Sequence, residues 1–214
     1  NPANNRMFAV AKLRPDGSLH TGFGFLGLRT VDFDLVINGW DQLRGVSPWA
    51  GDQLMLVGIA QVPGNANAPA MARLTAAGNA DATFGAGGKR VITNSPWAIE
   101  DLKFKVAARQ TDGKFVFAGW CQDCPWSRGA LVLRVDANGT PEPGFGTNGW
   151  ASFAVPERTT LAAITIDSSG RIVLAGFDGD LAGDPHTPVI ARFLPNGSAD
   201  TSFGIGTGYV RLTN

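Results

Sequence analysis

The chain has 214 residues, in which 18 Lys and Arg balance 18 Asp and Glu, and only 17% of the residues are charged. This balance argues against electrostatic capture of nucleic acid or of an anionic membrane surface, so we expect no nucleic-acid partner. No apolar run approaches the roughly 20 residues that a membrane span needs, and we expect no insertion into a membrane.

A motif that contains a Phe-Gly pair occurs four times along the chain. Its Phe residues are Phe23, Phe84, Phe145 and Phe203, within the aligned segments 11–27, 72–88, 133–149 and 191–207. A second motif, found as GDQLMLVGIAQ, DGKFVFAGWCQ and SGRIVLAGFDG, lies between these copies. Both motifs share a period of about 60 residues, so the chain consists of tandem copies of one unit.

Each period predicts four short strands joined by turns. In the second complete copy we expect strands over 102–110, 114–120, 130–136 and 149–155. Asp-Gly and Asn-Gly pairs mark the turns, and no segment shows a sustained helical period with caps. A repeated four-stranded unit of this length is typical of a β-propeller blade. We therefore expect an all-β protein, a β-propeller with about three and a half repeats.

The repeat begins part-way through a period, at its third strand, and closes after a fourth strand. We place the units at roughly 1–37, 38–98, 99–156 and 157–214, in a single propeller domain or a fragment of one. An open blade exposes unpaired amides and carbonyls. Three explanations stay open: the chain is a piece of a longer propeller, it closes as a compact four-bladed ring, or a partner chain shares strands with it.

The segment 29–50 departs from the regular pattern of strands. We expect it to hold the outer strand of its blade together with an irregular loop. Pro48 interrupts a stretch that is unbroken in the neighbouring periods, and a Pro weakens a strand because it has no amide hydrogen to donate.

Several charged residues recur at the same repeat positions. A basic residue is followed eight positions later by an acidic one in three pairs: Arg73 and Asp81, Arg134 and Glu142, and Arg192 and Asp200. We predict that each Arg holds its carboxylate across a turn by a charge-assisted hydrogen bond. The first copy has Lys12 and His20 instead, so we expect no such clamp there and a structural role for His20.

The aromatic and glycine residues that recur at the same repeat positions also predict structural roles. The four Phe residues of the motif, with Ile59, Trp120 and Phe177, are expected to fill the core between blades. The glycines that precede the last three, Gly58, Gly119 and Gly176, are expected to permit a close backbone approach or a bulge.

The last copy of the motif, ARFLPNGSADTSFGIG, resembles the bacterial delta-60 repeat, a propeller-type repeat of about this length. Segment 191–207 matches almost letter for letter, 72–88 and 133–149 match well, and 11–27 matches less well. The resemblance implies tandem blades in secreted or surface proteins, and hence an extracellular or periplasmic location. It implies no established common activity.

Cys121 and Cys124 form a C-x-x-C pair in the loop after the second strand of a blade. A redox pair needs a helix N-terminus to lower its thiol pKa, and a zinc site needs four ligands. A small structural disulfide in an exported protein is favoured, while free thiols, redox chemistry and metal binding stay as alternatives.

The corresponding loop of the next blade concentrates Asp178, Asp180, Asp184 and His186. Carboxylates at alternate positions suit calcium, although the spacing is not that of an EF-hand and Asp is also an ordinary turn residue. Calcium is the one cofactor that the sequence suggests, as a weak possibility, and we expect no other cofactor.

Four tryptophans lie outside the repeated core positions: Trp40, Trp49, Trp97 and Trp126. Exposed aromatic side chains in loops anchor sugars and protein partners, although these four are equally compatible with burial beneath their own loops. Together they make a ligand-binding surface our hypothesis.

Two classes of function follow from these features. The favoured one is a non-enzymatic binding scaffold that contacts a protein or carbohydrate ligand through its loops. The alternative is a polysaccharide hydrolase or lyase, which would use carboxylates among Asp32, Asp34, Glu100, Asp101 and Glu157. With two histidines in the chain, a nucleophile–histidine arrangement is hard to build, and we name no catalytic residue.

Overall fold

The computed structural model describes residues 5–64, 66–97, 102–121, 129–155, 159–179 and 186–212. Within these residues the chain is all-β, apart from one short 3-10 helix. The elements in chain order are β1 (Phe8–Ala11), β2 (Leu28–Val31), β3 (Gln42–Pro48), η1 (Ala50–Asp52), β4 (Leu54–Val62), β5 (Ala66–Leu74), β6 (Lys89–Val91), β7 (Leu102–Arg109), β8 (Phe115–Cys121), β9 (Gly129–Val135), β10 (Trp150–Ala154), β11 (Thr160–Ile166), β12 (Ile172–Asp178), β13 (Thr187–Phe193) and β14 (Tyr209–Arg211). No helix in this described part is long and apolar enough to cross a membrane.

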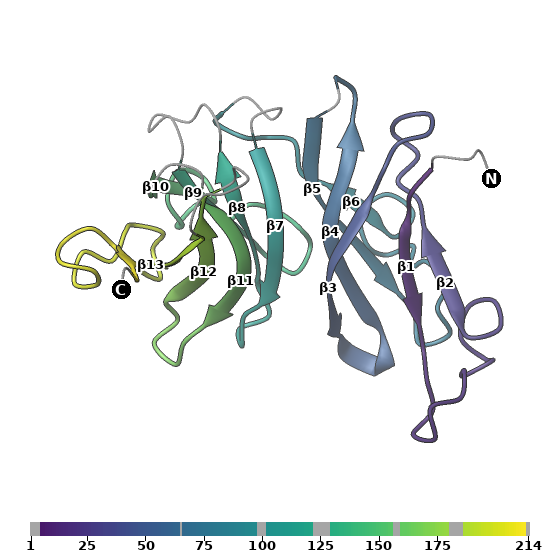
Figure 1. The fold of residues 1–214 in the computed structure, drawn as a ribbon. Helices are drawn as coiled ribbons and strands as arrows, with labels where there is room; N and C mark the ends of the chain where they lie inside the picture. The colour runs from purple at the N-terminus through teal and green to yellow at the C-terminus, as the bar shows by residue number, and fades with distance from the viewer. Residues whose placement is uncertain are drawn as a thin grey trace. The chain divides into compact units, whose positions relative to one another are not determined.

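The strands form four antiparallel sheets, each made of strands that follow one another in the chain (Figure 1). Two compact units contain them, residues 1–93 and 94–214. The first unit holds a two-stranded sheet, β1-β2, and a four-stranded sheet, β3-β4-β5-β6. The second unit holds two four-stranded sheets, β7 to β10 and β11 to β14.

The predicted strands of the second complete copy are confirmed to within two residues, as β7, β8, β9 and β10. The first sheet consists of strands that align with the third and fourth strands of the other sheets, as the repeat phase predicted. The segment 29–50 contains the end of β2, a loop over 32–41 and β3. Pro48 is the last residue of β3, which lies at the edge of its sheet, where a missing amide hydrogen is tolerated.

Every four-stranded sheet has a β-bulge at the same place in its first strand. In each first strand, the bulge residue has no paired residue in the neighbouring second strand. These bulge residues are Arg44 in β3, Lys105 in β7 and Ala162 in β11. A glycine faces each bulge, at Gly58, Gly119 and Gly176. A Cβ on these glycines would lie 2.0–2.2 Å from a carbonyl oxygen of the first strand. The expected close backbone approach is therefore confirmed.

In the first unit, the sheets meet where a turn glycine of one repeat lies on the Phe-Gly pair of the repeat before it. The amide of Gly24 donates to the carbonyl of Ala77 at 2.8 Å. A Cβ on Gly78 would lie 2.7 Å from the nitrogen of Gly24 and 3.0 Å from the ring of Phe23. We call this arrangement the Phe-Gly contact.

The second unit repeats the Phe-Gly contact between its own two sheets. The amide of Gly146 donates to the carbonyl of Asn196 at 2.7 Å. A Cβ on Gly197 would lie 2.9 Å from the nitrogen of Gly146 and 3.2 Å from Cε1 of Phe145. The same local sequence therefore joins neighbouring sheets in both units.

The core positions are buried unevenly. Phe23, Phe84, Phe145 and Ile59 are buried, as predicted. Phe203, Trp120 and Phe177 are half-buried, which differs from the prediction. Phe23 and Phe145 are each covered by a turn glycine of the next repeat, Gly78 and Gly197, and Phe203 belongs to the last copy of the motif.

Replacing Gly119 with Ala should destabilise the protein by about 1–3 kcal/mol, because the new methyl group would overlap the carbonyl of Lys103 at 2.1 Å. Chemical denaturation monitored by tryptophan fluorescence measures the change. The matched control is Gly144→Ala, since Gly144 has no heavy atom within 4 Å of its built Cβ and its φ is not positive. Equal stability of the two variants would contradict the bulge interpretation.

Candidate functional site

The candidate site lies in the second unit, where the first strands of its two sheets are in contact. Strand β7 leads into a tight turn in which the amide of Gly113 donates to the carbonyl of Gln110 at 3.0 Å. Strand β11 leads into the matching turn, in which the amide of Gly170 donates to the carbonyl of Asp167 at 2.9 Å. Both glycines have positive φ, which explains why Gly closes each turn.

The clamps predicted from the repeat are present in three copies. Nε of the Arg donates to a carboxylate oxygen at 2.8 Å in Arg73–Asp81 and at 2.7 Å in Arg192–Asp200, as predicted. In Arg134–Glu142 Nε and Oε2 lie 2.7 Å apart as an ion pair, without the geometry of a hydrogen bond. Lys12 and His20 form no ion pair among the described residues. The amide of His20 donates to the carbonyl of Lys12 at 2.8 Å, the same backbone bond that the acidic residue makes elsewhere. His20 therefore has the expected structural position.

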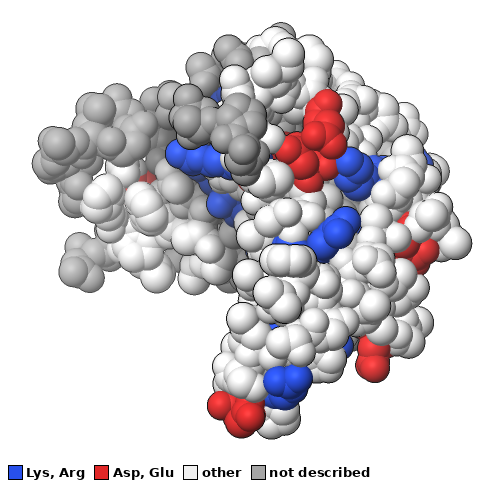
Figure 2. All heavy atoms as spheres, turned by 90° about the vertical axis from the view of Figure 1, so that its right-hand side faces the viewer, with Lys and Arg blue, Asp and Glu red and all other residues white. Residues whose placement is uncertain are grey.

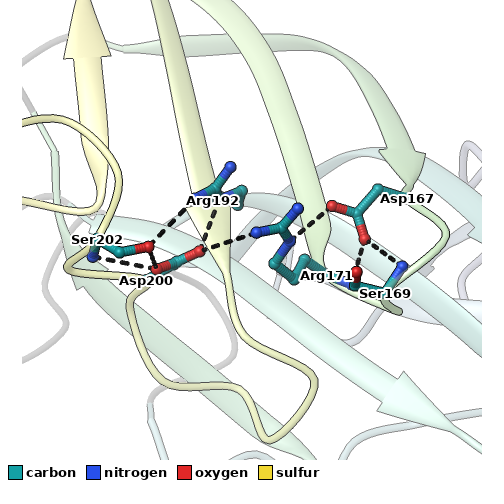
Figure 3. Close-up of polar contacts among 6 residues, drawn as sticks. All are labelled: Asp167, Ser169, Arg171, Arg192, Asp200 and Ser202. Carbon is teal, nitrogen blue, oxygen red and sulfur yellow. Dashed lines mark hydrogen bonds and ion pairs between the residues drawn. The ribbon is translucent and has the colours of Figure 1, made fainter.

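A second basic residue links each turn of the site to the Arg–carboxylate pair of its own sheet. The sequence did not predict this link. Lys114 lies 2.8 Å from Asp112 and 3.1 Å from Glu142. Arg171 bonds Asp167 at 2.7 Å and lies 3.9 Å from Asp200 (Figure 3). The aligned residue in the first unit is Gln53, whose amide donates to Asp81 at 2.9 Å. The residue that follows each turn therefore fixes that turn to its own sheet.

The Arg of each clamp also lies over the Phe of the Phe-Gly pair. The guanidinium carbon is 5.1, 4.4 and 4.4 Å from the ring centroid for Arg73 on Phe84, Arg134 on Phe145 and Arg192 on Phe203. Arg134 in addition donates from Nη1 to the carbonyl of Pro195 in the neighbouring repeat, at 2.6 Å. This bond joins the two sheets beneath the two turns.

A groove of about 460 Å³ lies between these turns, with Arg134 and Pro195 among its lining residues. This volume falls within the range of small-molecule sites. The remaining lining residues come from the β7–β8 side and from the β11–β12 side: Ala108, Arg109, Gln110, Thr111 and Asp112, and Ile164, Thr165, Ile166, Asp167, Ser168 and Gly170.

The groove combines neutral hydrogen-bonding groups with aliphatic carbon. Thr111, Thr165 and Ser168 are exposed and bring three hydroxyl groups. Gln110 is 9% exposed, and its Oε1 is buried without a hydrogen-bond partner among the described residues. Ile164 contributes half-buried apolar surface. No aromatic, His or Cys side chain is among the described residues that line the groove.

Both carboxylates of the groove are held in the ionised form. Partial burial opposes ionisation of Asp112, but hydrogen bonds from Lys114 outweigh it and lower the pKa of Asp112. Partial burial likewise opposes ionisation of Asp167, and hydrogen bonds from Arg171 bring its pKa below the ordinary value. Neither carboxyl group is therefore protonated at neutral pH, so neither can serve there as a general acid.

The tryptophans named from the sequence are distributed over the described part of the chain. Trp40 and Trp49 precede and follow β3, a strand of seven residues, which separates them by roughly 20–25 Å. Trp97 packs edge-on against the buried Trp150, with ring centroids 6.4 Å apart. All three are half-buried. Trp126 lies outside the described residues.

The two irregular loops named from the sequence fall mostly outside the described residues, as do Cys124, Asp180 and Asp184. Cys121 ends β8. Asp178 is 4% exposed and forms an ion pair with Arg211, so one of its carboxylate oxygens already has a cationic partner. Nδ1 of His186 lies 2.9 Å from the carbonyl of Gly179. The described residues hold no group of three metal-ligating side chains.

Two of the carboxylates considered for hydrolysis are among the described residues, and they lie near each other. Asp32 and Asp34 line a second groove, of about 290 Å³, in the first unit. Nζ of Lys89 donates to the carbonyl of Asp32 at 2.7 Å and lies 3.4 Å from the carboxylate of Asp34. Glu100, Asp101 and Glu157 lie outside the described residues.

Three segments of the chain match a family described as "Domain of unknown function (DUF5122) beta-propeller": residues 52–84, 110–145 and 168–203. Each match ends on the Phe of a Phe-Gly pair and includes the two central strands of one four-stranded sheet. These matches, just under half of the chain together, support a β-propeller repeat family and agree with the antiparallel sheets described above.

A solved structure of a protein of unknown function from Bacteroides caccae is also similar. The alignment covers 96% of this chain and 80% of that chain, at 8% sequence identity and a TM-score of 0.36, and at that score it carries no argument. No protein with curated annotation matches the chain.

The clamps predict a loss of stability in acid. Hydrogen bonds from the hydroxyl and amide of Ser202, assisted by Arg192, lower the pKa of Asp200 against the opposing effect of burial. A carboxyl group with a lowered pKa stabilises the fold above its ordinary pKa of 3.8 and loses that contribution as the pH falls through the folded value. The free energy of unfolding should therefore fall progressively as the pH drops below about 5.

Asp200→Asn should lower the stability at pH 7 and flatten this pH dependence, because Asn keeps the shape but cannot titrate. Urea denaturation across the pH range measures both effects. Asp52→Asn, at an exposed turn, should leave the unfolding free energy at pH 7 unchanged. An Asp200→Asn protein with the wild-type pH profile would show that the clamp does not contribute.

Proposed function

We propose that this chain is a non-enzymatic binding module, built from propeller repeats of the delta-60 type, and that the groove of the second unit binds a short neutral glycan. The observation that carries the proposal is the character of the groove. Three hydroxyl groups and one amide surround a space of about 460 Å³, while both neighbouring carboxylates are already paired with Lys114 and Arg171.

A neutral sugar fits this arrangement for two reasons. Its hydroxyl groups both donate and accept hydrogen bonds, as do the side chains of Thr111, Thr165 and Ser168. Its C–H faces can pack on the aliphatic surface of Ile164 and Ile166. A charged ligand would gain less from Asp112, Asp167 and Arg134, because these three groove residues already have partners of opposite charge within the chain.

The position of the groove also supports binding. It is built on paired strand ends and tight turns that Lys114, Arg134 and Arg171 fix in place, so little conformational entropy is lost when a ligand binds. The turns belong to different repeats, so their side chains vary without disturbing the repeated core.

A hydrolase or lyase is the weaker candidate for this groove. Glycosidic cleavage by a carboxylate pair needs one protonated acid, and the cations beside Asp112 and Asp167 lower both pKa values. A nucleophilic mechanism needs a base such as His, and the described lining residues include none.

Glycan-array screening followed by calorimetry tests the proposal. Thr165→Val and Ser168→Ala each remove one hydroxyl group from the groove, and each should weaken binding of the selected glycan by at least about tenfold. Thr201→Val is the matched control, since Thr201 is exposed in the same unit but does not line the groove. Affinity unaffected by both groove variants would contradict the proposed site, and release of reducing ends would contradict a non-enzymatic function.

We also propose an extracellular or periplasmic location, supported by the resemblance to delta-60 repeats and by the pairing expected for Cys121 and Cys124. In an oxidising compartment, two cysteines separated by two residues are expected to be joined as a disulfide. Protein purified without reductant should therefore resist alkylation at both positions until it is reduced. Mass spectrometry reads the result, and two alkylated thiols before reduction would contradict the disulfide.

A further inference from the structure

Gln110 differs from the equivalent residue of the next repeat in what its side chain contacts. The residue that follows the first strand of the sheet is Gln110 after β7 and Asp167 after β11. Asp167 uses both carboxylate oxygens inside its own turn (Figure 3). Its Oδ1 accepts from the amides of Ser169 and Arg171 at 2.9 and 3.0 Å, and its Oδ2 accepts from Nε of Arg171 at 2.7 Å. Oε1 of Gln110, in contrast, is buried and has no hydrogen-bond partner among the described residues.

The turn after β7 is stabilised without the oxygen of the Gln110 side chain. The amide of Lys114 donates to Oδ1 of Asp112 at 3.2 Å, and Nζ of Lys114 lies 2.8 Å from Oδ2 of the same residue. The backbone of Gln110 accepts from the amide of Gly113 at 3.0 Å and donates to the carbonyl of Lys114 at 2.8 Å. The turn therefore needs the backbone of Gln110, while Asp112 supplies the side-chain oxygens.

The Gln110 side chain is directed into the space between the two sheets of the second unit. Residues two positions apart in an extended segment share one face, so Val106, Ala108 and Gln110 lie on the same face. Val106 packs against the core cluster between the sheets, which includes Leu161 and Leu174 of the neighbouring sheet. Gln110 is 9% exposed and lines the groove together with Ala108. Its carboxamide therefore lies at the wall of the groove.

An unpaired buried oxygen is unfavourable for the fold. It has given up its hydrogen bonds to water and has gained none within the described part of the chain. Such atoms are uncommon in native proteins, and functional sites are one place where they occur. The hydrogen-bonding capacity of Gln110 is therefore available to a ligand of the groove.

We propose that Gln110 is the specificity-determining residue of the groove and that the ligand is an N-acetylated sugar, whose acetamido N–H donates to Oε1 of Gln110. This inference rests on the proposed binding of a neutral glycan in the same groove. Oε1 is covered in the structure, so a turn of the carboxamide about its last torsion accompanies binding. That torsion has a broad range in Gln side chains.

The acetamido group matches the groove in two respects. It places a hydrogen-bond donor beside a methyl group, as the groove places Gln110 beside the aliphatic carbon of Ala108, Ile164 and Ile166. The N–H and C=O of a trans amide also point in opposite directions. One acetamido group therefore donates toward the β7 side and accepts from a hydroxyl group on the β11 side, where Ser168 is exposed.

Sparse surface charge agrees with a neutral ligand of this class. The chain has 18 basic and 18 acidic residues, which gives a formal net charge of zero. On the face that Figure 2 shows, Lys and Arg side chains are interspersed with Asp and Glu, and most of the described atoms in view are uncharged. That face therefore offers no extended field of one sign to attract a charged ligand.

Matched pairs of disaccharides test the inference by calorimetry. N,N′-diacetylchitobiose is compared with cellobiose, and N-acetyllactosamine with lactose, because the members of each pair differ only in acetamido groups that replace hydroxyl groups. The wild-type protein should bind at least one N-acetylated disaccharide at least about tenfold more tightly than its partner.

Gln110→Met removes both polar atoms and keeps the length of the side chain. It should weaken binding of the N-acetylated disaccharide by at least about tenfold and leave the affinity for its partner within about twofold. Thr201→Val is the control, since Thr201 does not line the groove, and it should keep the wild-type ratio of affinities.

Urea denaturation of Gln110→Met separates ligand binding from a structural role. The free energy of unfolding should equal or exceed that of the wild-type protein, because apolar carbon replaces an unpaired buried oxygen. A clear loss of stability would show that the fold uses the carboxamide, and it would overturn the inference.

The binding outcomes distinguish this inference from the proposed function. Equal affinities within both pairs, or a ratio that Gln110→Met leaves unchanged, would overturn the role of Gln110 while a neutral glycan remained the ligand. Failure of both N-acetylated disaccharides to bind would also overturn the inference. The glycan array then decides separately whether the groove binds another neutral sugar.

Discussion

The structure depends on a backbone contact that is too close for any residue with a Cβ. In each unit, a turn glycine of one repeat lies on the Phe-Gly pair of the repeat before it, and the glycine of that pair donates its amide to a carbonyl of the turn. Gly78 and Gly197 also have positive φ, so both conformation and space require glycine. Because the contact joins residues 51 to 55 positions apart in sequence, it fixes the spacing between neighbouring sheets rather than the shape of one sheet.

The charged residues reinforce this contact. The Arg over the Phe ring holds a carboxylate of its own repeat, and in the second unit Arg134 also reaches the carbonyl of Pro195 in the next repeat. The cation after each tight turn extends the network to the end of the first strand, as Arg171 does for Asp167 and Asp200. The turns that border the groove are therefore fixed by the same residues that join the sheets. A repeated frame with variable turn side chains supports the proposal of a binding module.

The frame could be predicted from sequence because its residues recur in step. The bulge opposite Gly58, Gly119 and Gly176 and the Arg–carboxylate clamps each occupy one repeat position, and each is confirmed. The half-buried state of Phe203 was not predicted, because it depends on a neighbouring sheet and not on the local motif. The groove was not predicted either. It forms where turns of two different repeats meet, and Thr165 and Ser168 are ordinary residues for a strand and a turn.

Hydrogen exchange at two amides tests the importance of the Phe-Gly contact most directly. The amides of Gly24 and Gly146 lie in loops, where exchange is normally fast, but each donates to a carbonyl of the next repeat. If these bonds hold the sheets together, both amides should exchange as slowly as those in the centres of β4 and β8. Exchange at the rate of an unstructured loop, with the strands still protected, would show that the sheets are held together by something else.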